Sequence, residues 1–284
     1  MKKLLATICA AALLMTGCGG DSGNDKPAEE KPAEIKLGML TYLNATEQKL
    51  AEIYNAVADK AGFKGARHNP KFYDNLNSMQ MAIEAGEVQE VSLYKSVADY
   101  VIVNNDKFEI VKDDALDKLK NSFCFAVRKD DTQLKADLDK AIGEMKADGT
   151  LDKLINDYIT NVDKGQAPPK VDIPKIDGAP TLKVGITGDL PPLDLILPDN
   201  SPAGFNTALL AEIAKRLGRN IEPVQIESGA RATALTSKFI DVVFWAVIPL
   251  GNDIPADIDK PEGLELSTPY FQDSIAHLKL KADK

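Results

Sequence analysis

The residue types that carry most enzyme chemistry are scarce in this chain of 284 residues. Its histidines and cysteines are His68, His277, Cys9, Cys18 and Cys124. They match no zinc or redox spacing such as His-x-x-x-His or Cys-x-x-Cys, and the chain has neither a Gly-x-Ser-x-Gly elbow nor a P-loop. We therefore expect no cofactor, no metal ion and no catalysis, although a paired-carboxylate enzyme stays open. His68 is predicted to lie in a polar surface loop, residues 67–70.

Two side chains suit the recognition of a small ligand instead. Arg231 follows a predicted strand at Ile221–Ile226 and offers a planar pair of donors for a carboxylate. Trp245 ends a predicted strand at Ile240–Trp245, where an aromatic ring can stack on a ligand. A solvated helix arginine and a tryptophan packed in the core are the alternatives, and both remain open at this point.

Further candidates lie near the ends of predicted strands. They are Tyr42, Asn44, Thr46, Tyr94, Lys95, Ser96 and Asp189. Tyr42 provides a second aromatic wall, while Asn44 and Thr46 open a helix whose first N–H groups either receive a carboxylate or are simply capped. Lys95 offers a cation and Asp189 an acceptor for an ammonium group. A solvated surface side chain is the alternative for both.

Composition excludes some partners. With 34 basic and 43 acidic side chains the net charge is −9, which argues against nucleic acid because such partners require basic patches. An apolar content of 44% is ordinary for a globular protein. The length allows two modest domains or one large one.

The first residues are typical of an export signal. In residues 1–17, two lysines precede an apolar run that ends at Thr16-Gly17-Cys18. This ending resembles a bacterial lipobox, so we expect Cys18 to be lipidated and to hold the protein at a membrane; a plain secretory signal is the alternative. Residues 18–34 are rich in Gly, Pro and Glu and are predicted to form a flexible tether. Cys124 lies between two phenylalanines, which predicts a packed thiol.

Alternating strands and helices fill the remaining chain. We predict one unit over residues 35–121, followed at residues 122–162 by a strand and two closing helices. Residues 163–180 hold four prolines and are predicted to be a semi-extended linker, after which a second unit covers residues 181–284. Such alternation implies a largely parallel sheet covered by helices on both faces. Ligands of such sheets lie beyond the carboxyl ends of the strands.

Short motifs carry a resemblance to a known family. Residues 182–192 (LKVGITGDLPP), 204–206 (GFN) and 266–271 (LSTPYF) resemble the first lobe of the extracytoplasmic solute-binding proteins of family 3. Residues 82–88 (AIEAGEV) and 146–151 (KADGTL) are similar to the second lobe and closing segment of that family. The resemblance implies a periplasmic-binding-protein-like α/β fold with two doubly wound lobes, a ligand cleft and a two-strand hinge.

The order of these motifs differs from that of the family, in which the first lobe comes first. We infer a circular permutation in which the linker joins what are normally the two termini; a tandem copy of one lobe is the alternative. Surface termini that lie close together make such a rearrangement tolerable. The hinge strands are then expected at residues 122–128 and 274–280.

The resemblance also implies a function: binding of a small polar solute, an amino acid or related carboxylate, and its delivery to the permease of an ABC importer. Two departures bear on the ligand. Residues 248–259, where the family usually carries the carboxylate-binding arginine, contain none, and Tyr94 occupies the place of the usual ammonium-binding aspartate. A sensory module or a dehydratase-like enzyme on the same fold is the alternative.

Overall fold

The computed structural model describes residues 33–60, 62, 65–112, 119–250 and 254–282. By their internal contacts residues 32–284 form one unit, separate from residues 1–31. The predicted signal peptide, Cys9, Cys18 and all but the end of the predicted tether fall outside the described residues. The following paragraphs concern the second unit.

Short apolar runs and amphipathic helices alternate in the first half of this unit. Its elements are β1 (Glu34–Leu40), α1 (Glu47–Lys60), β2 (Arg67–Tyr73), α2 (Leu76–Glu84), β3 (Glu90–Tyr94), α3 (Lys95–Asn104) and β4 (Phe108–Ile110). β1 lies between β2 and β3 and runs parallel to both. The carboxyl ends of these three strands therefore meet at one edge of the sheet.

The predicted surface loop at residues 67–70 is wrong, because these residues begin β2. β1 supplies a complete ladder of partners, from Glu34 opposite Arg67 to Leu40 opposite Tyr73. β2 is an edge strand, where a proline is tolerated, and Pro70 is buried opposite Leu37. The polar composition of this segment did not predict a strand, because pairing with β1 is what makes it one.

The rest of the chain contributes the second half and the connections. Its larger elements are β5 (Lys120–Arg128), α4 (Thr132–Ala147), α5 (Thr150–Ile155), the π-helical turn η2 (Asn156–Thr160), β6 (Thr181–Ile186), α6 (Phe205–Leu217), β10 (Asn220–Gln225), the 3-10 turn η3 (Ser228–Ala230), α7 (Arg231–Thr236), β11 (Val242–Leu250), β12 (Leu264–Leu266) and β13 (Phe271–Leu280). A separate small sheet holds β7 (Asp189–Leu190), β8 (Asp194–Ile196) and β9 (Pro202–Ala203).

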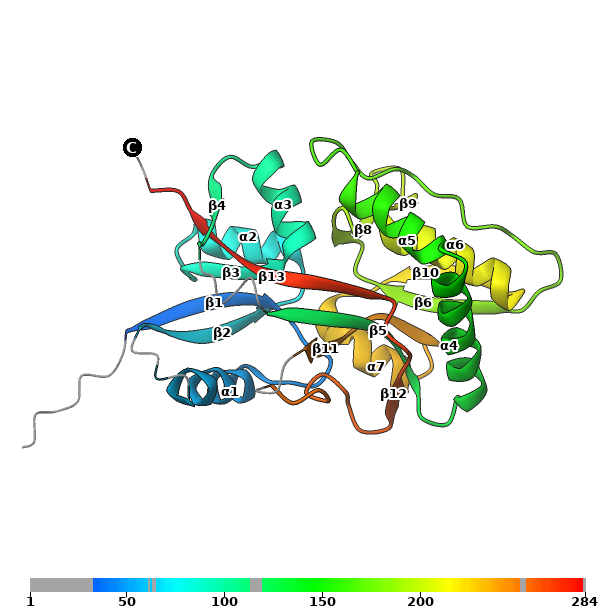
Figure 1. Ribbon diagram of the computed structural model, residues 1–284, viewed down its shortest axis with the longest axis horizontal. Coiled ribbons are helices and arrows are strands. Elements are labelled where there is room, and N and C mark those ends of the chain that lie inside the picture. The colour runs from blue at the N-terminus through cyan, green and yellow to red at the C-terminus, as the bar shows by residue number, and fades with distance from the viewer. Residues whose placement is uncertain (1–32, 61, 63–64, 113–118, 251–253, 283–284) are drawn as a thin grey trace, which may run out of the picture. The chain divides into compact units, whose positions relative to one another are not determined.

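One continuous sheet joins the two halves, in the order β10-β6-β11-β5-β13-β3-β1-β2. β13 makes the junction (Figure 1): Phe271–Ser274 pair antiparallel with β5, and Ile275–Leu278 pair antiparallel with β3. β5 in turn pairs with β11 of the second half. β5 and β13 are the strands expected to form the hinge, and their ladder lies at residues 120–123 and 271–274.

The helices bury the faces that their apolar spacing predicts. In α4 the predicted stripe of Leu134, Leu138, Ile142 and Met145 is buried, which confirms the amphipathic pattern. Aromatic rings on the paired strands β5 and β11 pack together, and Phe125 contacts both Phe244 and Tyr270. These rings form part of a core cluster that draws residues from both halves.

The proline-rich linker follows the surface of the second half. It contains no helix or strand, and Lys170 makes one isolated bridge to Ala203. Asn220, at the start of the edge strand β10, fixes the linker: its amide accepts from Ile176 N–H (2.8 Å) and donates to the carbonyls of Ile176 (2.9 Å) and Ala179 (3.0 Å). A single side chain thus ties the linker to the sheet edge.

Candidate functional site

A small buried cavity lies where the two halves meet. Its lining residues come from the ends of β1, β3 and β6, from β7, η3, the start of α7 and β11, and from the loop before β12: Leu40, Thr41, Tyr42, Tyr94, Thr187, Leu190, Ser228, Arg231, Trp245, Val247 and Asp259. Its volume is about 20 Å³, enough for a single water molecule. The structure therefore shows the two halves closed on each other. As predicted for this class of sheet, the cavity lies beyond the carboxyl ends of parallel strands.

Arg231 is the cation of this cavity. Its side chain donates to three backbone carbonyls: Nε to Ser228 (3.0 Å), one terminal nitrogen to Trp245 (2.7 Å) and the other to Thr41 (2.6 Å). The residue is only 6% exposed, so the alternative of a solvated helix arginine is wrong. A guanidinium has five N–H donors, and these three bonds leave two that can serve a ligand.

Asp259 is the anion of the cavity and was missed by the sequence analysis. Its carboxylate accepts from the N–H groups of Leu43 (2.5 Å), Asn44 (3.3 Å) and Val247 (3.2 Å). Burial raises the pKa of the carboxyl to about 6, although the charge of Arg231 and the three N–H groups act in the opposite direction. The available signal was an aspartate inside the segment where the family arginine is absent.

Aromatic rings form the walls. Tyr94 and Trp245 lie 6.1 Å apart between ring centroids, and Tyr42 stacks on Phe72 at 5.9 Å. Burial raises the pKa of Tyr42 and of Tyr94 above the ordinary value of 10, so both hydroxyls stay neutral at physiological pH. The Tyr94 hydroxyl can therefore donate a hydrogen bond to a ligand, whereas the Tyr42 hydroxyl already bonds to Tyr54.

Trp245 occupies a different position from the one predicted. The sequence places it at the end of a strand, but it lies in the middle of β11, which continues to Leu250. It lines the cavity and is also only 2% exposed, so it belongs both to the cavity wall and to the packed core. Asn206, in the amide orientation that satisfies its neighbours, accepts a 2.8 Å hydrogen bond from the indole N–H.

The structure brings Tyr42, Tyr94, Arg231 and Trp245 together on the cavity, whereas the other five predicted site residues lie outside its lining. Asn44 donates to the carbonyl of Ile258, and Thr46 caps α1 by accepting from Lys49 N–H (3.2 Å). Asn44 and Thr46 therefore make hydrogen bonds within the protein.

Lys95, Ser96 and Asp189 also have partners within the protein. Lys95 forms an ion pair with Asp99 one turn further along α3. Ser96 donates from its hydroxyl (2.6 Å) and its N–H (3.0 Å) to Asp273 of β13. Asp189 accepts from Leu76 N–H (2.5 Å) at the start of α2, and its predicted alternative as a solvated loop residue is wrong because burial is large enough to raise its pKa.

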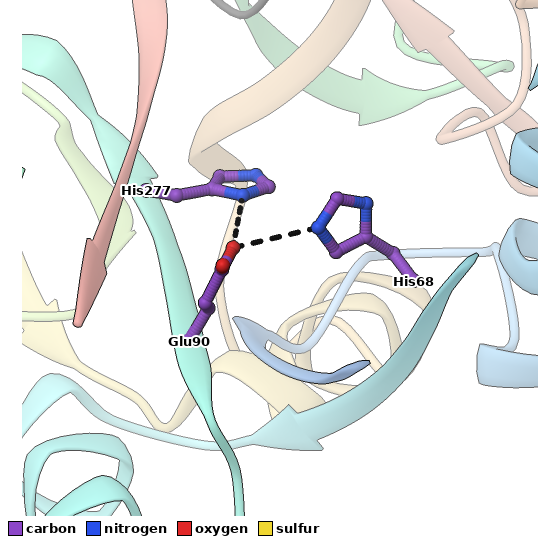
Figure 2. Close-up of side chains that lie close together, drawn as sticks. All are labelled: His68, Glu90 and His277. Carbon is purple, nitrogen blue, oxygen red and sulfur yellow. Dashed lines mark hydrogen bonds and ion pairs between the residues drawn. The ribbon is translucent and has the colours of Figure 1, made fainter. Parts of the chain in front are cut away.

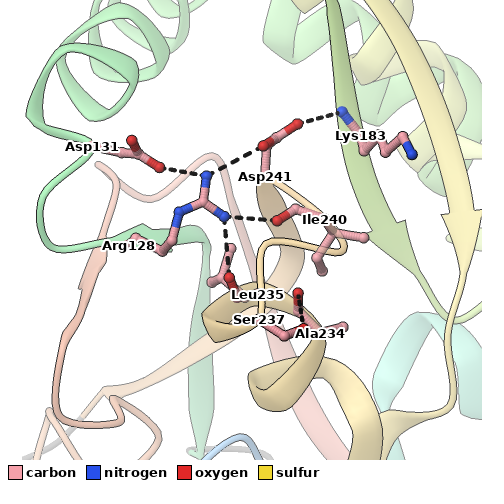
Figure 3. Close-up of polar contacts among 8 residues, drawn as sticks. All are labelled: Arg128, Asp131, Lys183, Ala234, Leu235, Ser237, Ile240 and Asp241. Carbon is pink, nitrogen blue, oxygen red and sulfur yellow. Dashed lines mark hydrogen bonds and ion pairs between the residues drawn. The ribbon is translucent and has the colours of Figure 1, made fainter.

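A second arginine anchors the end of α7. Arg128, the last residue of β5, donates to the carbonyls of Leu235 (3.1 Å) and Ile240 (2.8 Å) and pairs with Asp131 (2.6 Å) and Asp241 (3.2 Å) (Figure 3). It thereby holds the end of α7 and the segment before β11 against β5.

The family can be identified from the sequence. Residues 50–161 and 182–249 match the family of bacterial extracellular solute-binding proteins, family 3. The chain belongs to this family. Family 3 proteins are extracytoplasmic and bind small molecules, which agrees with a buried polar cavity between two α/β halves. None of the helices in the described ranges is both long and apolar enough to cross a bilayer.

Several solved structures are similar to this family 3 protein at low identity and low TM-score. The GluR0 ligand-binding core from Nostoc punctiforme, in complex with L-glutamate, is 11% identical with a TM-score of 0.36 over 87% of this chain and 84% of that one. The periplasmic aliphatic sulphonate binding protein SsuA from Escherichia coli is 9% identical, with a TM-score of 0.36 over 88% and 62%. The BvgS periplasmic domain of B. pertussis is 14% identical, with a TM-score of 0.40 over 87% of this chain and 37% of that one. No curated protein matches the sequence closely enough to count as a relative.

Proposed function

We propose that this protein binds a small zwitterionic solute, such as an amino acid, between its two halves and delivers it to the permease of an ABC importer. The observation that carries the proposal is that Arg231 and Asp259 line the same buried cavity. One can bind a carboxylate and the other an ammonium group, while Tyr94 and Trp245 form a flat wall. The protein is a binding protein and not an enzyme in this proposal.

The closed cavity determines how a ligand would enter. A volume of about 20 Å³ excludes an amino acid, so the halves have to separate before binding and close again around the solute. In the closed form the charge of Arg231 acts to lower the pKa of Asp259, although burial outweighs it. A zwitterion would bring a carboxylate to Arg231 and an ammonium group to Asp259, so that each buried charge gains a partner of opposite sign.

A ligand panel tests the proposal. Calorimetry and thermal shift on the full chain would compare amino acids with amines that lack a carboxylate and with carboxylates that lack an amine. We expect heat and stabilisation with members of the first group only. A screen in which single-charge compounds bind equally well would refute the zwitterion assignment, and conversion of a bound compound would refute the binding-only function.

Matched variants separate the two charges. Arg231→Ala and Asp259→Asn are each expected to lower affinity by about tenfold or more, since each removes a charged hydrogen-bond partner. Arg216→Ala and Asp199→Asn serve as controls, because these residues pair with Asp148 and Lys170 outside the cavity lining. Unchanged affinity in folded Arg231→Ala protein would contradict the carboxylate role.

Anchoring by lipid at Cys18 is part of the same proposal. It rests on the basic, apolar and Thr16-Gly17-Cys18 pattern at the start of the chain. Labelling of cells with a fatty-acid probe should mark the wild-type protein and leave Cys18→Ser unmarked, with Cys124→Ser as the control. A labelled Cys18→Ser variant would contradict it.

We also propose that the halves are circularly permuted relative to the family. The order of the family motifs along the chain and the pairing of β5 with β13 support this order. A chain rearranged so that residues 181–282 precede residues 33–162 should fold and bind the same ligand. Under the lobe-duplication alternative, the rearranged chain has no reason to recover that affinity.

A further inference from the structure

The two histidines of the chain, His68 and His277, lie far apart in sequence and side by side in the fold. His68 comes from β2 and His277 from β13, and Glu90 at the start of β3 lies between them (Figure 2). The rings meet edge to face with their centroids 5.0 Å apart. One ligand atom from each of the three residues lies within 4.8 Å of the other two.

The sheet register explains why these side chains converge. His68 pairs with Ile35 of β1, and Glu90 pairs with Leu37 two residues further along the same strand. His277 pairs with Ser92, which is two residues from Glu90. Because paired residues project to the same face and the side-chain period of a strand is two, all three groups emerge on one face of the sheet.

We propose that His68, Glu90 and His277 form a binding site for a divalent transition-metal ion of the zinc type. Two imidazoles and one carboxylate are a common protein donor set for zinc, with a fourth position left to water. Bonds of about 2.1 Å in a tetrahedral site place neighbouring ligand atoms about 3.4 Å apart. Glu90 Oε2 lies 3.4 Å from His68 Nε2 and 3.0 Å from His277 Nδ1.

Burial supports the assignment. The side chains of His68, Glu90 and His277 are 30%, 13% and 5% exposed, so the site is enclosed on one side and can be reached from solvent on the other.

The location separates this site from the solute cavity. Glu90 begins β3 and Tyr94, which lines the cavity, ends it, so about 13 Å of strand lies between them. A bound ion would join the junction strand β13 to β2 and β3. Its expected effect is to stabilise the attachment of β13, and the inference does not depend on the proposed solute function.

Metal titration of the full chain tests the site. After removal of metal with a chelator, calorimetry with Zn²⁺ should show one ion bound per chain and a rise in Tm. His68→Ala is the main variant because His68 is half-buried, and it is expected to weaken Zn²⁺ binding about tenfold or more. Glu90→Gln should do the same.

The control is Glu109→Gln. Glu109 of β4 forms an ion pair with Lys279, which lies on β13 like His277. Glu109 is outside the cluster, so this variant should bind Zn²⁺ like the wild type. Imidazole nitrogen NMR gives a second readout, since both histidine rings should shift together when Zn²⁺ is added. Failure to bind Zn²⁺, or equal binding by wild type and His68→Ala, would overturn the proposal and leave the cluster as a histidine–carboxylate ion pair.

Discussion

At the scale of single residues, Asp194 is a buried carboxylate for which the described residues provide neutral hydrogen-bond donors. Asp194 is fully buried and accepts from the N–H groups of Thr187 (3.0 Å) and Gly188 (2.9 Å). Burial raises the pKa of this carboxyl to about 6, assisted by the nearby charge of Asp189, while the hydrogen bonds oppose the rise. Asp194 therefore holds the turn after β6, and its contribution to the free energy of unfolding depends on pH.

The sign of that dependence can be predicted. An aspartate titrates near 3.9 in the unfolded chain, so between about pH 4 and pH 6 the folded state binds more protons than the unfolded state. The free energy of unfolding should therefore fall as the pH rises through this window. Urea unfolding at pH 4.5 and pH 7 should show a smaller difference in Asp194→Asn than in wild type. Asp199→Asn, in an exposed turn, is the control, and an identical difference in both variants would contradict the role of Asp194.

At the scale of elements, hydrophobic spacing predicts what is periodic and local. The stripe of α4 and the strands β3, β5 and β6 follow their apolar patterns closely. β2 was missed because its partners, not its composition, make it a strand. For the same reason the sequence did not predict the position of Asp259 or the cluster of His68, Glu90 and His277. Strand register and the path of the chain determine which polar groups meet, and local sequence patterns do not reveal either.

The start of α6 shows a backbone constraint of this kind. Gly204 precedes the helix with a φ of +92°, and a Cβ atom there would lie 2.6 Å from the carbonyl oxygen of Pro192. Both the conformation and the contact with rigid backbone oppose a side chain, so Gly204→Ala should lower the free energy of unfolding by about 2 kcal/mol or more.

Gly143 provides the matched control for this prediction. It lies on the exposed side of α4 with no atom near the place of a Cβ, so Gly143→Ala should raise stability by about 0.5–1 kcal/mol. Chemical denaturation of both variants distinguishes the two effects. Equal changes in the two would show that the contact with Pro192 has no consequence.

At the scale of the whole unit, the closed arrangement is held by polar contacts between the halves. Arg231 reaches Thr41, Asp74 accepts from Gly229 N–H (3.0 Å), and Asp189 accepts at the start of α2. β5 and β13 provide the covalent paths between the halves at the same junction. Two of these three contacts are made by carboxylates, those of Asp74 and Asp189.

Removing those carboxylates should favour an open form. In the double variant Asp74→Ala, Asp189→Ala we expect a larger radius of gyration by small-angle scattering than in wild type without ligand, because two contacts that cross the cleft are lost. Addition of a binding solute should reduce the difference. The exposed Asp199→Ala is the control, and a radius that matches the wild type would show that these contacts do not maintain closure.

The position of Trp245 has a practical consequence. It is the single tryptophan of the chain, and it lies in the cavity wall against Tyr94, Phe123 and Phe244. Its emission on excitation at the red edge of the indole band therefore originates from one place in the molecule. Opening would bring water to the indole and shift that emission to longer wavelength, and solute entry would reverse the shift. The protein thus carries a built-in fluorescent reporter of its own opening, which needs no attached dye.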